Sequence, residues 1–341
     1  MTTSLPGGEA RRLRPSGLRA GRGPGRIEGP AAALGLVAEE LAAAERALRT
    51  LVVSDVAAVP HVAGYLADAG GKRLRPALTA LGARAAGFRG PVAELACCGE
   101  LIHLGSLLHD DVVDQGEVRR GRPAAQVVWG NAVAVLTGDF CVARALLAAS
   151  RHGGPRAAEQ LAETVTEMAV GEVVQLQHAG DLDNDLATYL SVVERKTASL
   201  IGWCAAAGAW AAEDVAAADA LQTYGRKVGV AFQITDDVLD YRHGTGKEVG
   251  RDLAERKVTL PLLHAMQRLP DLHGTLAEGA PSPAELRELV EVIRASGALD
   301  DALVDAAAYA TDAVDALRAL PPSEARDALE VLAGHVVERS R

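Results

Sequence analysis

The sequence predicts an all-α fold, and its composition and patterning support this in three ways. Alanine and leucine dominate a chain of 341 residues that is 49% hydrophobic but only 3% aromatic, and both residues lose little on entering a helix. From Ala31 onward, apolar residues recur at helical spacing. The sequence shows neither a sustained period-two alternation nor a repeated strand–helix–strand unit. We therefore expect one large helical domain with a sizeable core, spanning residues 31–341.

The first 30 residues have a different composition from the rest. They carry six arginines among many glycines and prolines and few apolar residues, so they bury too little surface to fold alone. A disordered basic tail is predicted for residues 1–30. Residues 1–6 lack the charged start and following apolar run that are typical of a signal peptide. A soluble cytoplasmic protein is therefore expected. The net charge of −10 argues against nucleic acid as a partner.

Helix boundaries can be read along the chain from proline, glycine and capping residues. Pro91 is expected in the first turn of a long apolar helix. Residues 197–212 form an uncharged stretch too short to span a bilayer, which predicts a buried core helix. Ser282 to Glu285 form a capping box with proline at the first helical position, and Gly297 ends that helix. Pro321 and Pro322 separate the last two helices.

Two aspartate motifs share one spacing, DDVVD at 110–114 and DDVLD at 236–240. In each motif the first and last aspartates are four residues apart, so they share a helix face and repel each other. A hard divalent cation would relieve that repulsion, and magnesium often bridges carboxylates to substrate phosphates. The alternative is two acidic ends of solvated helices. The repeated spacing after two apolar runs favours metal binding, and neither motif has the glycine and glutamate of an EF-hand loop.

Basic segments near these motifs suit a phosphate ligand. They are GGKRLRP at 70–76, the pair Arg119-Arg120, Lys196-Thr197, Lys247 and Lys257. Arginine binds phosphate through paired hydrogen bonds and lysine acts as a point charge. Arg73 stands where a P-loop needs serine or threonine, so that interpretation is rejected. For any single basic residue, a solvated surface charge is the alternative. His103 lies two helical turns before Asp110 on the same face.

Taken together, these motifs resemble the trans-isoprenyl diphosphate synthases, or polyprenyl synthetases. The resemblance covers nearly all of the chain from about residue 31. The matching segments are GGKRLRP at 70–76, ELIHxxSLLHDDVVD at 100–114, RRGRP at 119–123, GEVVQL at 171–176, KT at 196–197, FQITDDVLD at 232–240, GKEVGRDL at 246–253 and KVTLP at 257–261. The order and spacing of so many motifs make the resemblance specific.

The resemblance implies an all-α terpenoid-synthase fold, a helical bundle around a central cavity, usually as a homodimer. It implies that Asp110, Asp111, Asp114 and Asp236 are the chief magnesium ligands and that Asp237 and Asp240 complete the second motif. The residues expected to hold the allylic diphosphate are Arg119, Lys196, Thr197, Gln233 and Lys247. Those expected to hold isopentenyl diphosphate are Lys72, Arg75, His103 and Arg120.

The implied reaction joins isopentenyl diphosphate head-to-tail to an allylic diphosphate, which is the dimethylallyl, geranyl, farnesyl or geranylgeranyl compound. Magnesium, with three ions as the family's usual number, and the cationic side chains stabilise the departing diphosphate. An allylic carbocation forms and is attacked by the double bond of isopentenyl diphosphate. Release of a long apolar product also implies peripheral contact with a membrane.

Two other functions use related sequences. A terpene cyclase of the same fold usually replaces the second aspartate motif and lacks the isopentenyl site, whereas both are present here. A non-catalytic regulatory subunit of a prenyl synthase typically loses an aspartate motif, whereas both are intact. Turnover by the purified single chain separates an enzyme from a regulatory subunit.

Product length depends on the cavity floor, which in the family lies just before the first aspartate motif. Gly105 and Ser106 occupy the fifth and fourth positions before Asp110, and both are small. The motif also lacks the two-residue insertion of the bacterial short-chain type. A deep cavity and a product of six or more isoprene units are expected, with a geranylgeranyl (C20) product as the alternative. A second interpretation of Gly105 is that it permits close helix packing.

Overall fold

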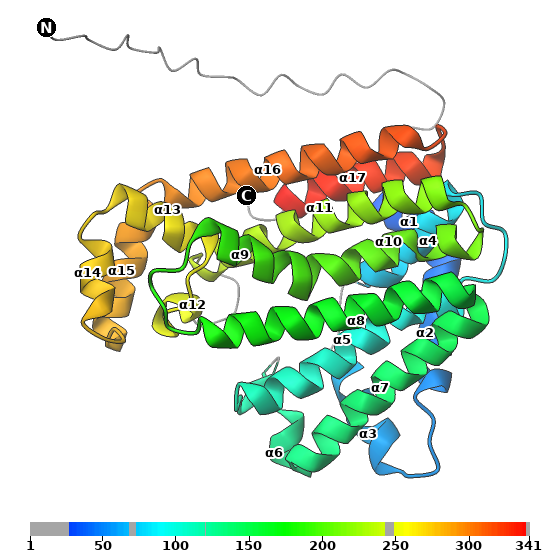
Figure 1. The fold of residues 1–341 in the computed structure, drawn as a ribbon, viewed down its shortest axis with the longest axis horizontal. Helices are drawn as coiled ribbons and strands as arrows, with labels where there is room; N and C mark the ends of the chain where they lie inside the picture. The colour runs from blue at the N-terminus through cyan, green and yellow to red at the C-terminus, as the bar shows by residue number, and fades with distance from the viewer. Residues whose placement is uncertain (1–26, 68–72, 120, 243–248, 339–341) are drawn as a thin grey trace, which may run out of the picture.

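The computed structural model describes residues 27–67, 73–119, 121–242 and 249–338, and these form a bundle of helices (Figure 1). The predicted all-α class is confirmed for them. The expected basic tail falls almost entirely on residues 1–26, which lie outside the described residues. Helices begin at Pro30, close to the predicted start of the domain at residue 31.

The first half of the chain contains α1 (Pro30–Gly35), α2 (Ala38–Leu51), α3 (Ala58–Ala67), α4 (Leu74–Ala85), α5 (Ala93–Val113), β1 (Val118–Arg119), β2 (Arg122–Pro123), α6 (Ala125–Trp129), α7 (Asn131–His152) and α8 (Gly154–Gln177). The second half contains α9 (Leu186–Val193), the π-helical turn η1 (Glu194–Ala198), α10 (Ser199–Ala211), α11 (Val215–Asp240), α12 (Arg251–Ala254), α13 (Leu260–Arg268), α14 (Leu272–Ala277), α15 (Pro283–Ala295), α16 (Ala298–Ala316), the 3₁₀ turn η2 (Leu317–Ala319) and α17 (Glu324–Glu338).

Helix α10 forms the centre of the bundle. Every residue from Ser199 to Trp210 is buried, which confirms the core helix predicted at 197–212, although the α-helix proper begins only after η1. Its neighbours are α4, α8 and α11. A Cβ atom added at Gly82 of α4 would lie 2.0 Å from the carbonyl oxygen of Ala205, so only glycine lets α4 approach α10 this closely. Small residues therefore set the spacing of the central helices.

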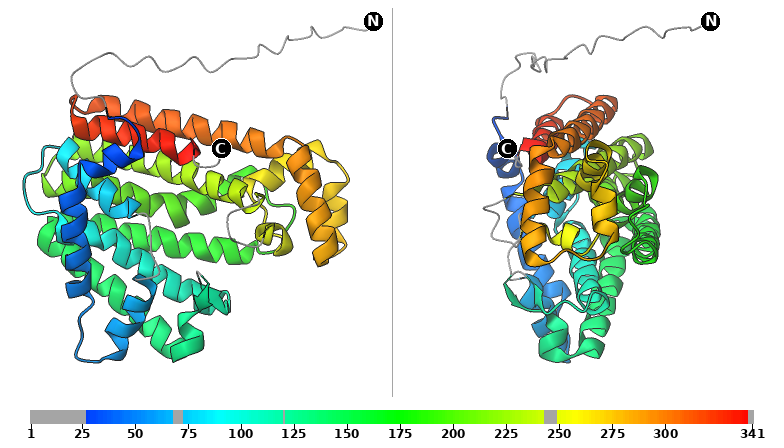
Figure 2. Two further views of the ribbon diagram at one scale, coloured as in Figure 1. Left: turned by 180° about the vertical axis from the view of Figure 1, so that it is seen from behind. Right: turned by 90° about the vertical axis from the view of Figure 1, so that its left-hand side faces the viewer.

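The remaining helices cover this centre on two sides. On one side α16 packs on α11, and α17 packs on α16 and α4, forming the outer layer drawn in orange and red (Figure 2). On the other side α5 packs against α7, and α8 lies between α7 and α10 (Figure 1). The layers leave the C-terminal turns of α5 and α11, where the two aspartate motifs lie, at one end of the bundle.

The structure confirms one predicted boundary and corrects two local expectations. Ser282 caps α15 in a capping box, and Gly297 follows that helix with a φ of 84°. However, α5 begins at Ala93 with Val92 as its cap, so Pro91 precedes the helix and does not form its first turn. The sequence also gave no sign of the small antiparallel pair β1–β2, in which Arg119 lies opposite Arg122. Gly121, in the connecting turn, has a φ of 75°, a value that glycine adopts without strain.

Helix α7 differs from the other long helices in its surface. Among the described residues it is the helix long and apolar enough to cross a membrane, and 39% of its most apolar window is buried inside the protein. From the sequence, a buried core helix was predicted over a membrane span at 197–212, and no prediction was made for α7. Leu136 and Leu147 of α7 are 66% and 39% exposed.

Gly82→Ala should destabilise the protein, because the new methyl group would overlap the backbone of Ala205 in α10. The expected loss is about 1–3 kcal/mol or more in the free energy of unfolding. Gly334→Ala is the matched control, since Gly334 is also a helical glycine but has nothing within 4 Å of its Cβ position. That change should be neutral or stabilise by roughly 0.5–1 kcal/mol. Urea unfolding of both variants checks the contrast, and equal stability of the two would contradict the packing described.

Candidate metal and diphosphate site

The two aspartate motifs are joined through η1. Lys196 of η1 places its Nζ 3.9 Å from Oδ2 of Asp110 on α5. The next residue, Thr197, donates a hydrogen bond from Oγ1 to Oε1 of Gln233 on α11, at 3.0 Å. One π-helical turn therefore contacts the helix of each motif.

The position of η1 depends on two glycines in neighbouring helices. A Cβ atom at Gly171 of α8 would lie 3.0 Å from the backbone nitrogen of Lys196, and one at Gly229 of α11 would lie 2.5 Å from Cα of Ala198. Any larger side chain would push η1 away from one of these helices. π-helical turns occur often at functional sites. The sequence identified Lys196-Thr197 as a motif but not the turn that carries it.

Within each motif the middle aspartate is buried and the outer two have solvent access. Asp111 is 1% exposed and Asp237 is 3% exposed, while Asp110, Asp236 and Asp240 are half-buried and Asp114 is exposed. This follows from helix geometry, because residues four apart share a face and the residue between them points elsewhere. The outer aspartates are therefore the ones open to a ligand.

The buried aspartates are held by neutral or cationic donors. Arg119 on β1 donates from Nε to Oδ1 of Asp111 at 2.7 Å, and Oδ2 of Asp111 is buried without a hydrogen-bond partner. Asp237 accepts from the Tyr189 hydroxyl at 2.7 Å and from Nε2 of Gln233 at 2.8 Å. Both oxygens of Asp237 are thus occupied within the protein, which differs from its expected place in an open second motif.

The surroundings of Asp110 and Asp240 disfavour the ionised form of these two carboxyl groups. The pKa of Asp110 is raised to about 6, chiefly by burial and in part by Glu172 and Asp114, while Lys196 opposes the rise. Burial also raises the pKa of Asp240, with Asp252 adding to the shift. A low-dielectric environment and a neighbouring negative charge both disfavour the ionised form of a carboxyl group. Crowded carboxylates of this kind fit a divalent cation.

Magnesium fits the chemistry of these donors, since all of them are hard oxygens. Among the described residues, however, no three histidine, cysteine, aspartate or glutamate side chains lie close enough together to hold an ion. A magnesium ion here would need further oxygens from water or from a substrate phosphate, which is its usual mode of binding.

Lys196 links the first motif to a residue that the sequence analysis did not single out. Its ammonium group pairs with Glu172 of α8 as well as approaching Asp110. Glu172 belongs to the GEVVQL segment at 171–176, which was noted only as part of the resemblance. Because Glu172 shares Lys196 with Asp110, it positions the lysine at the mouth of the site.

Arg119 is held in place by the environment of the β1–β2 pair. The Tyr65 hydroxyl donates to the carbonyl oxygen of Pro123 at 2.9 Å, and the rings of Tyr65 and Trp129 meet edge-on at 5.1 Å. Nε2 of Gln126 donates to the carbonyl oxygen of Asp111 at 2.9 Å. These contacts fix the short pair of strands against α3, α5 and α6.

The residues expected to hold isopentenyl diphosphate are only partly described. Arg75, in the first turn of α4, lies 3.9 Å from Glu100, and its Nε is buried without a hydrogen-bond partner. His103 is half-buried on α5. Lys72 and Arg120, and Lys247 of the allylic site, lie outside the described residues. Arg73 pairs with Glu45 and Glu100 and so has a structural role.

The space beside Gly105 is filled. A Cβ atom there would lie 3.0 Å from the carbonyl oxygen of Gly138 and 3.3 Å from Cγ2 of Val142, both on α7. The expectation that Gly105 leaves room for a growing chain is corrected, since close packing of α5 on α7 accounts for the glycine. Ser106 is half-buried and donates from its hydroxyl to the carbonyl oxygen of His103 at 3.0 Å.

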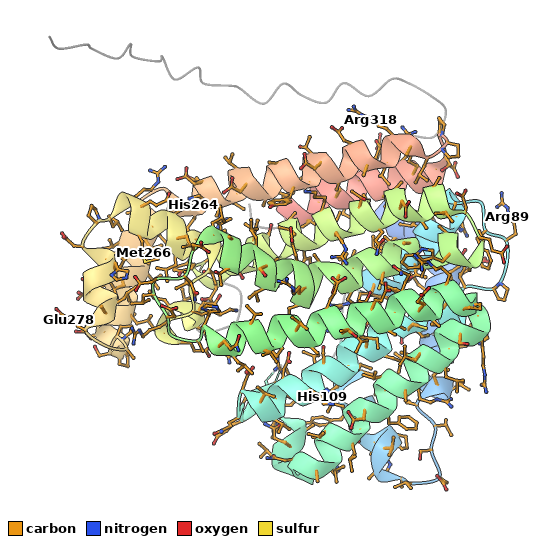
Figure 3. All side chains as sticks on the ribbon, viewed as in Figure 1. Arg89, His109, His264, Met266, Glu278 and Arg318 are labelled. Atoms are coloured by element: carbon orange, nitrogen blue, oxygen red, sulfur yellow. The ribbon has the colours of Figure 1, made fainter. Side chains whose placement is uncertain are left out.

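His109, next to the first motif, also faces α7 (Figure 3). Its Nε2 lies 3.1 Å from the carbonyl oxygen of Val135 and 3.3 Å from Oδ1 of Asp139. This contact could not be predicted from the sequence, because nothing in the motif separates a ligand-facing histidine from a packed one. It ties the last turns of α5 to α7 and so fixes the direction of Asp110.

Arg119→Gln should destabilise the protein even without substrate. It leaves the carboxylate of Asp111, which is 1% exposed, without its cationic partner. The expected loss is roughly 1–3 kcal/mol, the usual cost of stranding a buried charged group. Arg122→Gln, on the paired strand, removes an exposed cation that lies 5.9 Å from the Tyr65 ring and should cost less than about 1 kcal/mol. Thermal unfolding distinguishes them, and equal losses would show that Asp111 does not depend on Arg119.

Comparison with known proteins agrees with this geometry. Residues 56–293 match the family model described as polyprenyl synthetase. The chain is 41% identical over 297 residues to an octaprenyl diphosphate synthase of Haemophilus influenzae, covering 84% of this chain and 90% of that protein. A polyprenyl synthase of Caulobacter crescentus, solved with calcium and isoprenyl diphosphate, superposes with a TM-score of 0.86 at 40% identity, covering 93% of this chain and 100% of that one.

A decaprenyl diphosphate synthase of Rhodobacter capsulatus superposes with a TM-score of 0.85 at 36% identity, covering 92% of this chain and 99% of that one. The resemblance drawn from the motifs is thereby confirmed, together with the terpenoid-synthase type of helical bundle. The chain belongs to the polyprenyl synthetase family and is a trans-prenyltransferase.

Proposed function

We propose that this protein condenses isopentenyl diphosphate with an allylic diphosphate and builds a linear polyprenyl diphosphate of six or more isoprene units. The observation that carries the proposal is the joining of both aspartate motifs through Lys196 and Thr197 of η1. Similarity to an octaprenyl and a decaprenyl diphosphate synthase supports a long product over the geranylgeranyl alternative.

The outer aspartates would hold magnesium, with three ions as the proposed number. Asp110, Asp114, Asp236 and Asp240 are the candidates, because they have solvent access. When bound, magnesium supplies Lewis-acid stabilisation of the negative charge on the departing diphosphate. The middle aspartates, Asp111 and Asp237, orient the motifs from their buried positions.

The cationic and polar side chains would bind and orient the two diphosphates. Lys196, Thr197 and Gln233 lie together for the allylic diphosphate, with Arg119 next to Asp111. Arg75 has an Nε without a hydrogen-bond partner that could donate to isopentenyl diphosphate, and His103 lies on α5, which packs against α4. Holding both substrates in line lets the double bond of one attack the carbocation formed from the other. Leu104 and Leu108, on the turns of α5 that precede Asp110, are buried, and an apolar site of this kind would exclude water from that cation.

A second copy of the chain is the proposed partner of α7. Leu136, Phe140, Ala143 and Leu147 follow one another along one face of α7 at helical spacing, and Leu136 and Leu147 are 66% and 39% exposed. A row of apolar residues on a long helix marks a protein or membrane contact. We infer a homodimer that pairs these faces, with a cytoplasmic location and peripheral membrane contact at product release.

Activity should disappear with excess EDTA and return with magnesium, because the outer carboxylates then lack the cation that lets them accept a diphosphate. Asp110→Ala and Asp236→Ala should each lower kcat by at least about 10²–10³, the usual loss for one preorganised stabiliser. Asp219→Ala is the control, since Asp219 is an exposed aspartate on the same helix as Asp236. Steady-state turnover of the single chain measures all three. Undiminished turnover in chelator would contradict the metal mechanism, and no turnover of the parent chain would favour a regulatory subunit.

Ser106→Phe should shorten the product, because a ring at this position of α5 would block the path below the aspartates. Gly105→Ala should leave the product unchanged and lower stability modestly, since its methyl group would press on Gly138. Mass spectrometry of the products, with the parent run alongside, gives the chain lengths. A parent-length ladder from an active Ser106→Phe variant would remove Ser106 from the floor of the cavity.

Leu136→Glu should convert the dimer to a monomer, because it places a charge in the middle of the apolar face of α7. Val304→Glu is a suitable control, as Val304 is similarly exposed at 68% but lies on α16. Sedimentation velocity gives the mass of each variant. A monomeric parent, or a dimer that survives Leu136→Glu, would place the contact elsewhere.

A further inference from the structure

A chain of three hydrogen bonds leads from Tyr189 into the site. Tyr189 on α9 donates its hydroxyl to Oδ2 of Asp237 at 2.7 Å. Gln233 donates from Nε2 to the other oxygen of Asp237 at 2.8 Å. Thr197 then donates from Oγ1 to Oε1 of Gln233 at 3.0 Å. Three separate elements, α9, α11 and η1, are linked by this one chain.

The first link is shielded from water. Tyr189 is 7% exposed and Asp237 is 3% exposed. A buried carboxylate is stable only when its oxygens accept hydrogen bonds. Each oxygen of Asp237 receives one donor, so loss of the Tyr189 hydroxyl would leave Oδ2 unsatisfied.

The hydrogen bonds that link these residues also have a defined direction. The amino group of the Gln233 amide faces Asp237 and donates to it. The carbonyl oxygen of Gln233 then faces Thr197 and accepts a hydrogen bond from its hydroxyl group. Tyr189 holds Asp237, which receives the amino group of Gln233, and Gln233 in turn receives the hydroxyl of Thr197.

The chain ends beside the functional side chains proposed above. Thr197 follows Lys196, whose ammonium group lies 3.9 Å from Asp110. Asp237 follows Asp236, an outer aspartate of the second motif. A small rotation of Asp237 would therefore displace the second motif directly. It would also displace η1, through Gln233.

We propose that Tyr189 is a positioning residue for prenyl transfer, which fixes Asp237 and, through it, the Gln233 amide and the Thr197 hydroxyl for binding a metal-bound diphosphate. This inference rests on the proposed function, because it concerns the same site. It adds a residue that lies outside both aspartate motifs and outside the Lys196-Thr197 pair.

The test is Tyr189→Phe, which removes one hydroxyl and keeps the ring. Tyr224→Phe is the matched control, since Tyr224 is fully buried and donates its hydroxyl to the carbonyl oxygen of Leu329, also at 2.7 Å. Tyr224 lies thirteen residues before Asp237 on α11, about 20 Å along the helix. Both variants lose one buried hydrogen bond, but only one of them touches the site.

Two readouts separate positioning from stability. The first, without turnover, is the rise in melting temperature caused by magnesium with inorganic diphosphate. The second is kcat together with KM for each substrate. Tyr189→Phe should lose most of the ligand-induced rise and lower kcat by about tenfold or more, the factor expected for a lost hydrogen bond to a charged group. The KM for isopentenyl diphosphate should change little, and Tyr224→Phe should keep the parent's ligand response and kinetic constants.

Identical ligand response and kinetics in the two variants would overturn the inference. If Tyr189→Phe does not fold, Asp237→Asn replaces it, because the asparagine keeps the volume and the Tyr189 contact but presents an amino group that Gln233 must turn to accommodate. Parent-like constants in Asp237→Asn would equally overturn the inference. The parent protein separates failure of this inference from failure of the proposed function. A parent with no ligand response and no turnover refutes the proposed function itself and the inference with it.

Discussion

The site depends on the close backbone contact of η1 with α8 and α11. Gly171 and Gly229 permit this contact, because a Cβ atom at either position would overlap η1. The contact places Lys196 between Asp110 and Glu172 and places Thr197 against Gln233. It brings a cationic side chain of η1 to the first motif and a hydroxyl group of η1 to the helix of the second motif. A packing constraint between small residues thus determines where the positive charge of the site lies.

The six aspartates of the motifs divide into two kinds by geometry. The middle ones, Asp111 and Asp237, are buried and satisfied by Arg119, Tyr189 and Gln233. The outer ones have more solvent access, and burial and like charge raise the pKa of Asp110 to about 6. The buried aspartates accept hydrogen bonds that orient the motifs, and the outer carboxylates have the solvent access that a ligand needs. The DDxxD spacing therefore places one buried aspartate, which orients the motif, between two aspartates that have more solvent access.

The sequence predicted the parts of the structure that depend on local chemistry. Helix class, the capping box at Ser282, the core helix after residue 197 and the two aspartate faces all follow from composition and spacing. Contacts between distant segments were not predictable in this way. Tyr189 meets Asp237 from 48 residues away, and Gly105 meets Gly138 across two helices. A small residue before the motif suggested a cavity, yet only the neighbouring helix could show that the space is filled.

The central claim is that the two aspartate motifs act as a single site for a diphosphate and its metal. Calorimetric titration of inorganic diphosphate, with and without magnesium, tests this most directly on the parent and on Asp110→Asn and Asp236→Asn. The account predicts binding to the parent only when magnesium is present, and a large loss of affinity in each variant alone. Parent-like binding in either variant would show that one motif suffices, and it would contradict the account.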